Sequence, residues 1–171
     1  MTEIQNYQQG ALSAGEAARL KNLRDALQAA HADFSLLAHD LPTRSAQDGV
    51  EQGFGALASM APTFILRAET GYLAAIIRGD MRLVYKKIKK KLSLKNISLA
   101  TPEQVKLMTG AEVGYVSLVN WGLPTLIDSC LAELDTIYGG CGVPYHTLKI
   151  DPRDLIALLQ AQVFDFTEPK V

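Results

Sequence analysis

A tight turn between two β-rich segments near the middle of the chain limits the folds that this sequence can form. Residues 62–67 (PTFILR) and 72–77 (YLAAII) flank the turn residues Glu69, Thr70 and Gly71, a spacing typical of a β-hairpin. A hairpin pairs its strands antiparallel, whereas the alternation of helices and strands in the rest of the chain favours parallel pairing. We therefore expect an α+β (mixed α/β) fold that contains both kinds of strand pair.

Capping signals predict where the helices begin. Ser13 and Glu16 have the spacing of a capping box, which starts a helix at residue 14. Thr101 and Gln104 repeat that spacing, with a proline at the first helical position. Together with the apolar spacing, these signals predict helices over 14–30, from 45, and over 84–92, 101–110 and 151–160. They also predict strands at 34–37, 97–99, 113–116, 125–127, 136–138, 146–150 and 162–166.

The composition is that of a globular domain. The chain has 171 residues, of which 48% are hydrophobic, and its 17 basic and 18 acidic residues leave a net charge of -1. This balance excludes a globally basic nucleic-acid-binding protein, an acidic disordered chain and a collagen-like repeat. We expect one domain over 13–171, preceded by a flexible N-terminal extension over 1–12 that is polar and has no periodic pattern.

The sequence contains no signal for a membrane or for an oxidising compartment. No apolar stretch approaches the ~20 residues that span a bilayer, and no secretory signal peptide opens the chain. The two cysteines, Cys130 and Cys141, do not make a disulfide framework, and neither they nor the three scattered histidines have metal-site spacing. We expect a cytoplasmic protein with no metal and no other cofactor.

Lysines crowd one segment of the sequence. Seven of the 17 basic residues lie between Arg82 and Lys95, with no acidic residue among them. Such a cluster creates a positive field that can bind the phosphates of a nucleic acid. The alternative interpretation is a solvated helix face above three apolar residues. The predicted nucleic-acid-binding residues are Lys86, Lys87, Lys89, Lys90 and Lys91.

Two segments that contain glycine are candidate ligand sites. Residues 112–125 place two glycines and a proline between apolar segments, and residues 139–142 contain three glycines. Glycine permits positive φ angles and lets a ligand approach the backbone, although a plain connection is the alternative for the first segment. In the second segment, Cys141 and His146 could pair as nucleophile and base, and the alternative is an ordinary thiol in a turn.

Several short motifs occur in a characteristic order. They are 62–67 (PTFILR), 77–80 (IRGD), Lys86 and Lys87 with Leu92, 99–105 (LATPEQV), 109–114 (TGAEVG), 123–128 (LPTLID), 139–142 (GGCG) and 147–155 (TLKIDPRDL). Over about residues 20–167, this order resembles the YbaK/prolyl-tRNA-synthetase-associated editing domain, a family of aminoacyl-tRNA deacylases. The resemblance implies a strongly curved mixed β-sheet wrapped by helices, with one pocket.

The resemblance also implies a reaction and its site. The reaction is hydrolysis of the ester between a wrongly attached amino acid and a tRNA 3′ end, with the mischarged tRNA as partner and an aminoacyl-tRNA synthetase as a further candidate partner. Gly114 corresponds to the glycine of the loop whose backbone places the attacking water, which makes it the predicted catalytic residue. The predicted substrate-binding residues are Tyr115, Val116, Ser117, Leu118, Gly139, Gly140 and Gly142.

The chain departs from the family pattern at two positions. The family has a lysine near the start of the central strand, where this chain has Pro62, and a proline in the loop, where it has Leu118. Arg67 and Arg78 are the basic residues nearest to Pro62 in the sequence. The alternative to a trans-editing hydrolase is therefore a weakened or inactive module that binds an aminoacyl-adenosine, an amino acid or tRNA without hydrolysis.

Overall fold

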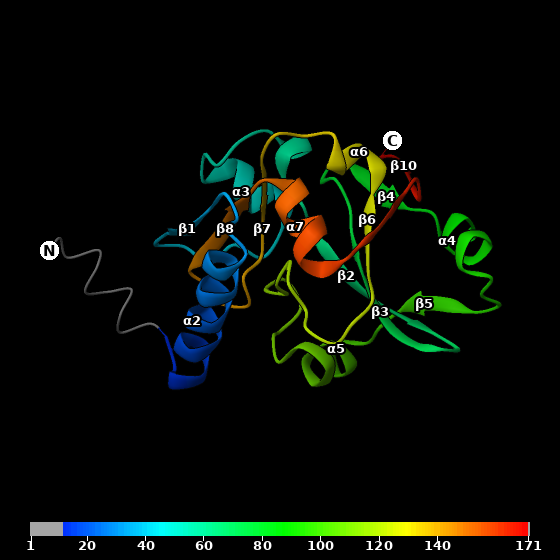
Figure 1. The fold of residues 1–171 in the computed structure, drawn as a ribbon, viewed down its shortest axis with the longest axis horizontal. Helices are drawn as coiled ribbons and strands as arrows, with labels where there is room; N and C mark the ends of the chain where they lie inside the picture. Colours follow the sequence, from blue (N-terminus) through cyan, green and yellow to red (C-terminus); the bar gives the residue numbers. More distant parts are fainter. Residues whose placement is uncertain (1–11, 171) are drawn as a thin grey trace, which may run out of the picture.

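The computed structural model describes residues 12–170, and the α+β class expected from the sequence is confirmed (Figure 1). The helices are α2 (Ala14–Ala29), α3 (Ala46–Glu51), α4 (Tyr85–Leu92), α5 (Pro102–Thr109), α6 (Ser129–Ala132) and α7 (Pro152–Leu159), with a 3-10 helix, η1 (Leu57–Ser59). The strands are β1 (Phe34–Ala38), β2 (Thr63–Ala68), β3 (Gly71–Ile76), β4 (Met81–Leu83), β5 (Ile97–Leu99), β6 (Thr125–Asp128), β7 (Ile137–Gly139), β8 (His146–Ile150), β9 (Gln162–Phe164) and β10 (Thr167–Pro169). Within residues 12–170, no helix has the length and apolarity needed to cross a membrane.

The strands form three sheets. The largest has the order β5-β2-β3-β6-β9, in which β2 pairs antiparallel with β3 and β5, while β6 pairs parallel with β3 and β9. The predicted hairpin is therefore β2–β3, and the predicted mixture of pairings is present. A second sheet places β8 between β1 and β7, and a third pairs β4 with β10. A bridge between Met60 and Tyr138 joins the first two sheets, and the Ala61 N–H donates to the Tyr138 carbonyl over 2.8 Å.

The predicted capping boxes are present. Ser13 and Glu16 each bind the other's backbone at the start of α2, and Thr101 and Gln104 do the same at the start of α5. Each box satisfies two N–H groups that the first turn of a helix leaves without partners. Gly110 ends α5 with a φ of +75°, a conformation that glycine adopts without steric cost.

Helices cover the sheets from two ends of the molecule. α2 and α7 pack over one end, where α2 buries Leu20, Leu23 and Leu27 in a cluster that also contains Ile150 and Leu155. The lysine-rich helix α4 lies at the opposite end of the molecule from α2 (Figure 1). It buries Ile88 in a separate cluster, which includes Leu66 and Phe166. The largest sheet thus separates two apolar clusters, and each is covered by helices from different parts of the chain.

Two predicted strands differ in the structure. Residues 113–116 form no strand, because Gly114 has a φ of +97° and the Tyr115 N–H donates to Glu112 in a turn. The strand expected over 162–166 ends at Phe164, because the Phe166 N–H donates to the Asp128 side chain. The sequence does not predict the short elements β4, α6 and β10.

The extension expected over residues 1–12 falls outside the described residues, except for Leu12. Leu12 is partly buried and packs against the core cluster of α2.

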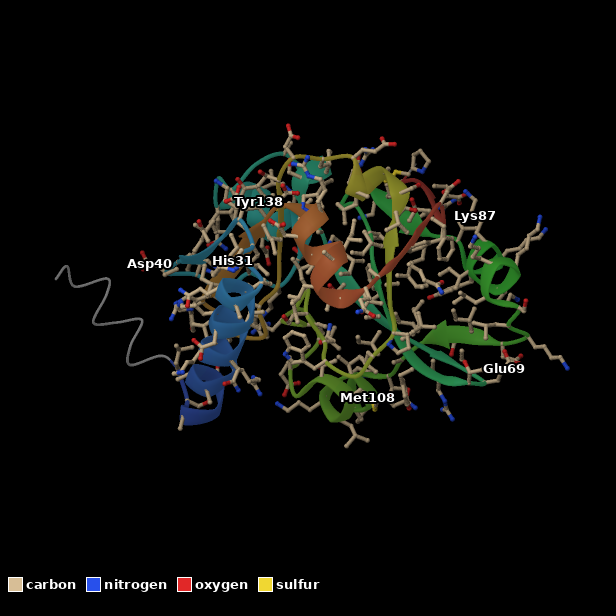
Figure 2. All side chains as sticks on the ribbon, in the orientation of Figure 1. His31, Asp40, Glu69, Lys87, Met108 and Tyr138 are labelled. Carbon is tan, nitrogen blue, oxygen red and sulfur yellow. The ribbon has the colours of Figure 1, made fainter. Side chains whose placement is uncertain are left out.

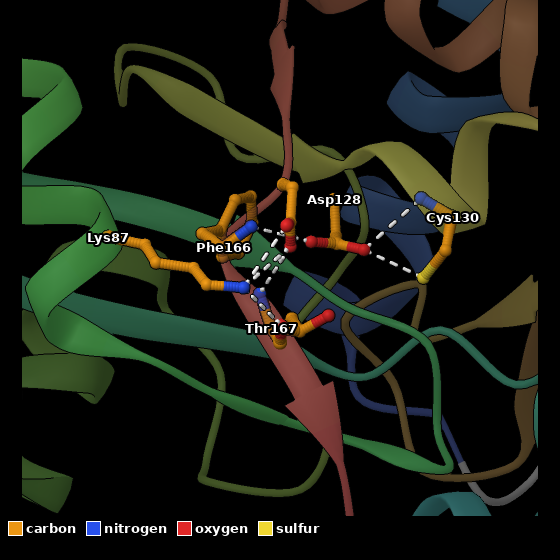
Figure 3. A network of polar contacts seen from close by, with 6 residues as sticks. Lys87, Asp128, Cys130, Phe166 and Thr167 are labelled. Atoms are coloured by element: carbon orange, nitrogen blue, oxygen red, sulfur yellow. Dashed lines mark hydrogen bonds and ion pairs between the residues drawn. The ribbon is translucent and has the colours of Figure 1, made fainter.

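A buried carboxylate holds the path of the chain between β9 and β10. Asp128 is only 1% exposed, and its Oδ1 accepts a hydrogen bond from the Phe166 N–H over 2.9 Å (Figure 3). Its Oδ2 accepts from the backbone N–H and the thiol of Cys130, over 3.2 and 2.7 Å. Nearby, the Lys87 ammonium donates to the Thr167 carbonyl over 3.0 Å and so connects α4 to the same segment. Because a buried carboxylate is stable only when it is hydrogen-bonded, these contacts determine where β10 begins.

We predict that Asp128→Ala lowers the free energy of unfolding by about 2–3 kcal/mol, because it leaves the Phe166 N–H buried without a partner and removes the cap of α6. Asp135→Ala is the matched control, since Asp135 is exposed and makes no hydrogen bond or ion pair within residues 12–170. Urea unfolding of the two variants measures the difference. If both substitutions lower the free energy of unfolding equally, Asp128 has no special structural role.

Candidate active site

A cavity of about 370 Å³ lies where the two larger sheets meet. Its wall is formed by the start of β2, the end of β7, the start of β8, the segment that leads into α3 and the loop around Gly114. Tyr138 from β7 lies close to α3 (Figure 2) and stacks on Phe54, with 6.1 Å between the ring centroids. The cavity is within the size range of small-molecule sites, and its wall combines apolar side chains with polar backbone groups.

The structure brings five of the eight predicted site residues to this cavity. They are Gly114, Tyr115, Val116, Gly139 and Gly140. The other three lie elsewhere. Ser117 and Gly142 line a second cavity of about 230 Å³ beside α2 and α5, and Leu118 is fully buried in the core. These three residues are therefore not part of the site that we propose below.

Two glycines of the 139–142 segment, Gly139 and Gly140, allow close packing of the segment 116–118. A Cβ atom on Gly140 would lie 2.0 Å from the Val116 carbonyl oxygen, and one on Gly139 would lie 2.6 Å from the Leu118 side chain. The Leu118 N–H donates to the Gly140 carbonyl over 2.9 Å and fixes this approach. Gly142 alone of the three has a positive φ. The absence of a Cβ at Gly139 and Gly140 thus gives room to another chain segment. The sequence had suggested instead that these glycines adopt positive φ angles or let a ligand approach the backbone.

Residue 114 must also be a glycine, because another chain segment lies close to it. Its φ of +97° is unfavourable for other residues, and a Cβ atom there would lie 3.0 Å from the Arg44 carbonyl oxygen. The loop around Gly114 therefore packs against the segment before α3 on one side and against Gly140 on the other. Two close backbone contacts hold this part of the cavity wall.

Two cations and no carboxylate or thiol line the cavity among the described residues. The Arg44 Nε donates to the Tyr115 hydroxyl over 2.6 Å, and its guanidinium lies 5.6 Å from the centre of that ring. The hydrogen bond to Tyr115 raises the pKa of Arg44. The second cation is Lys170, which follows β10. The cavity therefore has a positive local field, although the whole chain is almost neutral.

The two basic residues nearest to Pro62 in sequence do not reach the cavity. Pro62 itself lines it. Arg67 is exposed on β2 and is not part of the wall, and Arg78 is paired with Asp80, with 2.6 Å between Nε and Oδ1.

Two polar side-chain atoms of the wall residues lack a partner. Thr63 Oγ1 and His146 Nδ1 are buried and make no hydrogen bond within residues 12–170. Burial, with a smaller contribution from the neighbouring His39, lowers the pKa of His146 below its ordinary value of 6.5, so its imidazole is neutral at neutral pH. A neutral imidazole can both accept and donate a hydrogen bond, and Thr63 adds a hydroxyl. The polar groups of the wall can therefore bind a substrate or a water molecule.

Cys141 and His146 do not form a nucleophile–base pair. The Cys141 thiol donates to the backbone carbonyl of His146 over 3.2 Å rather than to its ring. Burial raises the pKa of Cys141 to about 12, so the thiol stays protonated and is a poor nucleophile. The ordinary buried thiol is the correct interpretation.

The five lysines of α4 differ in their surroundings, and Lys89 is half-buried. Lys87 is held by Asp165 and by the Thr167 carbonyl, so it has a structural role. Lys86, Lys90 and Lys91 are exposed, and Lys91 lies 5.8 Å from the centre of the Phe164 ring. The helix α4 thus packs through its apolar residues and presents exposed positive charge on its other face, and binding of a nucleic acid to that face stays a prediction. Phe64, which lines the cavity, packs in the same apolar cluster as α4.

Several residues of the cavity wall are not singled out by the sequence. Arg44 and Lys170 lie outside every motif described above, and Thr63 lies within the motif 62–67, which gives it no role of its own. His146 was considered only as a partner of Cys141. These residues meet only because β10 pairs with β4 and because β7 lies beside the start of β2, and local patterns contain no information on such contacts.

Comparisons with known proteins assign the chain to one group of relatives. Residues 41–158 match the family model described as an aminoacyl-tRNA editing domain. The proline–tRNA ligase of Solidesulfovibrio magneticus is 37% identical over 97 residues, which are 56% of this chain and 17% of that protein. The enzyme of the same name from Moorella thermoacetica is 33% identical over 92 residues, 53% of this chain and 16% of that protein. The chain thus matches less than a fifth of the length of these relatives.

Solved structures show the same fold. The hypothetical protein APE2540 superposes with a TM-score of 0.80 and 27% identity, covering 85% of this chain and 99% of that one. A proposed trans-editing enzyme for prolyl tRNA synthetase gives a TM-score of 0.78 with 24% identity, covering 92% of this chain and 99% of that one. Both solved chains are covered almost completely, so they share the fold over most of this chain.

We predict that Gly140→Ala destabilises the protein by about 2–3 kcal/mol, because the new methyl group forces the Val116 carbonyl away. Gly15→Ala is the control: Gly15 is exposed in the first turn of α2, where alanine meets no atom closer than 4.0 Å and should add about 0.5–1 kcal/mol of stability. Thermal or urea unfolding measures the change in stability of the two variants. A Gly140→Ala protein as stable as the parent would contradict the close backbone contact.

Proposed function

Because the chain belongs to the family of aminoacyl-tRNA editing domains, we propose that it hydrolyses the ester bond between a wrongly attached amino acid and the 3′ end of a tRNA. The observation that carries this proposal is the cavity itself. Backbone around Gly114 forms part of its wall, two cations line it, and no described carboxylate or thiol does. Such a site suits a substrate that has a carbonyl group and nearby phosphates, and it offers no acid pair and no cysteine nucleophile.

The backbone of the loop supplies candidate donors for the reaction. The N–H groups of Gly114 and Val116 make no hydrogen bond to another described group. When water attacks the ester carbonyl, negative charge develops on the carbonyl oxygen, and a fixed N–H donor stabilises that charge by about 3–4 kcal/mol. The tetrahedral intermediate then releases the ribose oxygen, which takes up a proton. The products are the free amino acid and the tRNA with its terminal hydroxyl restored.

The attacking water needs orientation more than a strong base, because an aminoacyl ester is already labile. The unpartnered His146 Nδ1 and Thr63 Oγ1 are candidates to hold that water. Since burial keeps the pKa of His146 low, its neutral ring can accept a hydrogen bond from water at neutral pH. Covalent catalysis by Cys141 is not part of this proposal.

Apolar residues of the cavity would select the amino acid. Met60, Ile65 and Val113 line the cavity, whereas Val119 and Trp121 border the second cavity. One methylene group more or less in such a pocket changes the binding free energy by about 1–3 kcal/mol. The cavity would therefore distinguish amino acids by the size and shape of their side chains. Because its relatives are proline–tRNA ligases, we propose the tRNA that accepts proline as the substrate to test first.

We predict that the protein at catalytic concentration deacylates at least one member of a panel of mischarged proline tRNAs. Gly114→Ala should lower kcat/KM by about 10²-fold or more, because the side chain would displace the loop that carries the donors. Gly122→Ala is the control: its φ of +82° gives the same backbone strain, but no atom lies within 4 Å of the new methyl group. The rate at which labelled amino acid is released from the charged tRNA gives kcat/KM for both variants.

The outcomes of this experiment separate the two functions. Failure of the parent protein to hydrolyse any ester would contradict the deacylase proposal. If the same protein still binds the charged tRNA, the module that binds without turnover becomes the correct interpretation. If Gly114→Ala and Gly122→Ala lower kcat/KM equally, the loop around Gly114 has no specific role in the reaction.

We also propose that the exposed lysines of α4 bind tRNA phosphates. Changing Lys86, Lys90 and Lys91 to Glu should weaken tRNA binding and reduce the salt slope, log Kd against log salt, by about 1 for each lost contact. Lys87 is left unchanged because it holds the segment after β9.

The control for this experiment changes Lys21, Arg24 and Lys149 to Glu. These residues are exposed on α2 and β8, away from α4, and the substitutions alter the net charge equally. An equal loss of affinity in both triple variants would indicate a general charge effect and would contradict a specific role for α4.

A further inference from the structure

We propose that Lys170, delivered by the C-terminal strand β10, binds the phosphate of the terminal nucleotide of the substrate. The inference rests on the proposed function and assigns a substrate-binding role to one residue of its site. Lys170 lies outside residues 41–158, the part of the chain that matches the family model, so membership of the family does not assign it a role. Its position relative to the cavity comes from the contacts described next.

Strand pairing fixes where Lys170 lies. β10 pairs antiparallel with β4, with Pro169 opposite Met81, and the Lys170 N–H continues the ladder by donating to the Asp80 carbonyl over 3.1 Å. The backbone of Lys170 is therefore held at the beginning of β4. From there its side chain reaches the cavity wall that Pro62 also lines.

The ammonium group is held against the same wall. Lys170 Nζ donates to the Gly79 carbonyl over 2.9 Å, and the Gly79 N–H donates to the Met60 carbonyl over 2.8 Å. Gly79 is packed closely against another backbone segment, since a Cβ atom there would lie 2.6 Å from the Leu57 carbonyl oxygen. A short chain of hydrogen bonds thus links the ammonium to Met60, which lines the cavity.

Lys170 keeps binding capacity for a ligand. Its ammonium has three N–H donors, and the one hydrogen bond to Gly79 uses one of them. It forms no ion pair within residues 12–170, since the nearby carboxylates of Asp80 and Glu168 are paired with Arg78 and Arg82. The other cation of the cavity, Arg44, is bonded to Tyr115. Neither cation of the cavity forms an ion pair with a described residue, and Lys170 keeps its other two N–H donors for a ligand.

An anionic oxygen is the partner that this arrangement favours. A lysine ammonium is a compact point charge that binds phosphate well, and it gains most from a ligand that carries a full negative charge. The amino acid of an aminoacyl ester has no free carboxylate, so the phosphates of the tRNA carry the negative charge at that end. The nearest of them belongs to the terminal nucleotide.

The test compares adenosine 5′-monophosphate with adenosine as probes, titrated into the full chain and followed by NMR chemical shifts. We expect the parent protein to bind the monophosphate more tightly than adenosine, and Lys170→Gln to abolish the difference. Lys170→Arg should retain it in part, because the charge is kept. Lys149→Gln, which removes an exposed lysine of β8, is the control and should leave it unchanged.

Two measurements separate a binding role from a structural one. Thermal unfolding of Lys170→Met, which keeps the aliphatic part of the side chain, reports whether the contact to Gly79 stabilises β10. In the deacylation assay, Lys170→Gln should lower kcat/KM by about 10-fold to 100-fold, with full-length tRNA as the substrate.

The proposal about Lys170 fails if the parent protein binds both probes equally, or if Lys170→Gln retains the preference for the monophosphate. It also fails if the parent protein hydrolyses the ester and Lys170→Gln does so at the same rate. If instead the parent protein hydrolyses no ester, the proposed function fails, and the two probes still decide the role of Lys170 independently.

Discussion

The close approach of two backbone segments, at Gly140 and at Val116, shapes the cavity on which the proposed function depends. A Cβ atom at residue 140 would lie 2.0 Å from the Val116 carbonyl oxygen, so the contact exists only because residue 140 has no side chain. The contact positions the loop that begins at Gly114. The Leu118 N–H donates a hydrogen bond to the Gly140 carbonyl and holds the two segments together. The site is thus defined by backbone geometry, which explains why so few of its residues have reactive side chains.

A site of this kind suits a reaction that needs little chemical assistance. An aminoacyl ester is labile, and hydrolysis requires an oriented water molecule and stabilisation of the charge on the carbonyl oxygen. Donors fixed in the backbone lose no side-chain entropy when they bind. Cations at the cavity, with no described carboxylate to oppose them, favour a substrate that has phosphates next to the ester.

The C-terminal segment is connected to the site through buried polar contacts. The Asp128 carboxylate accepts the Phe166 N–H and so ends the β9 ladder, after which the chain can pair with β4 as β10. That pairing brings Lys170 to the cavity wall. An interaction in the core, at the end of β6, therefore influences the charge of a site formed largely by other elements.

Local patterns in the sequence were sufficient for the fold class, the β2–β3 hairpin and the capped starts of α2 and α5, because these depend on neighbouring residues and on short-range hydrogen bonds. The family resemblance pointed to the loop at Gly114, where local patterns had predicted a strand, and the glycines at 139 and 140 were candidates from the sequence as well. The tertiary structure alone decided that Gly139 makes room for the side chain of Leu118 in the core and Gly140 for the backbone of Val116. It also decided that Arg44, Thr63 and Lys170 share one cavity. Those facts result from contacts between residues far apart in the chain, and the spacing of residues along a sequence contains no measure of such distances.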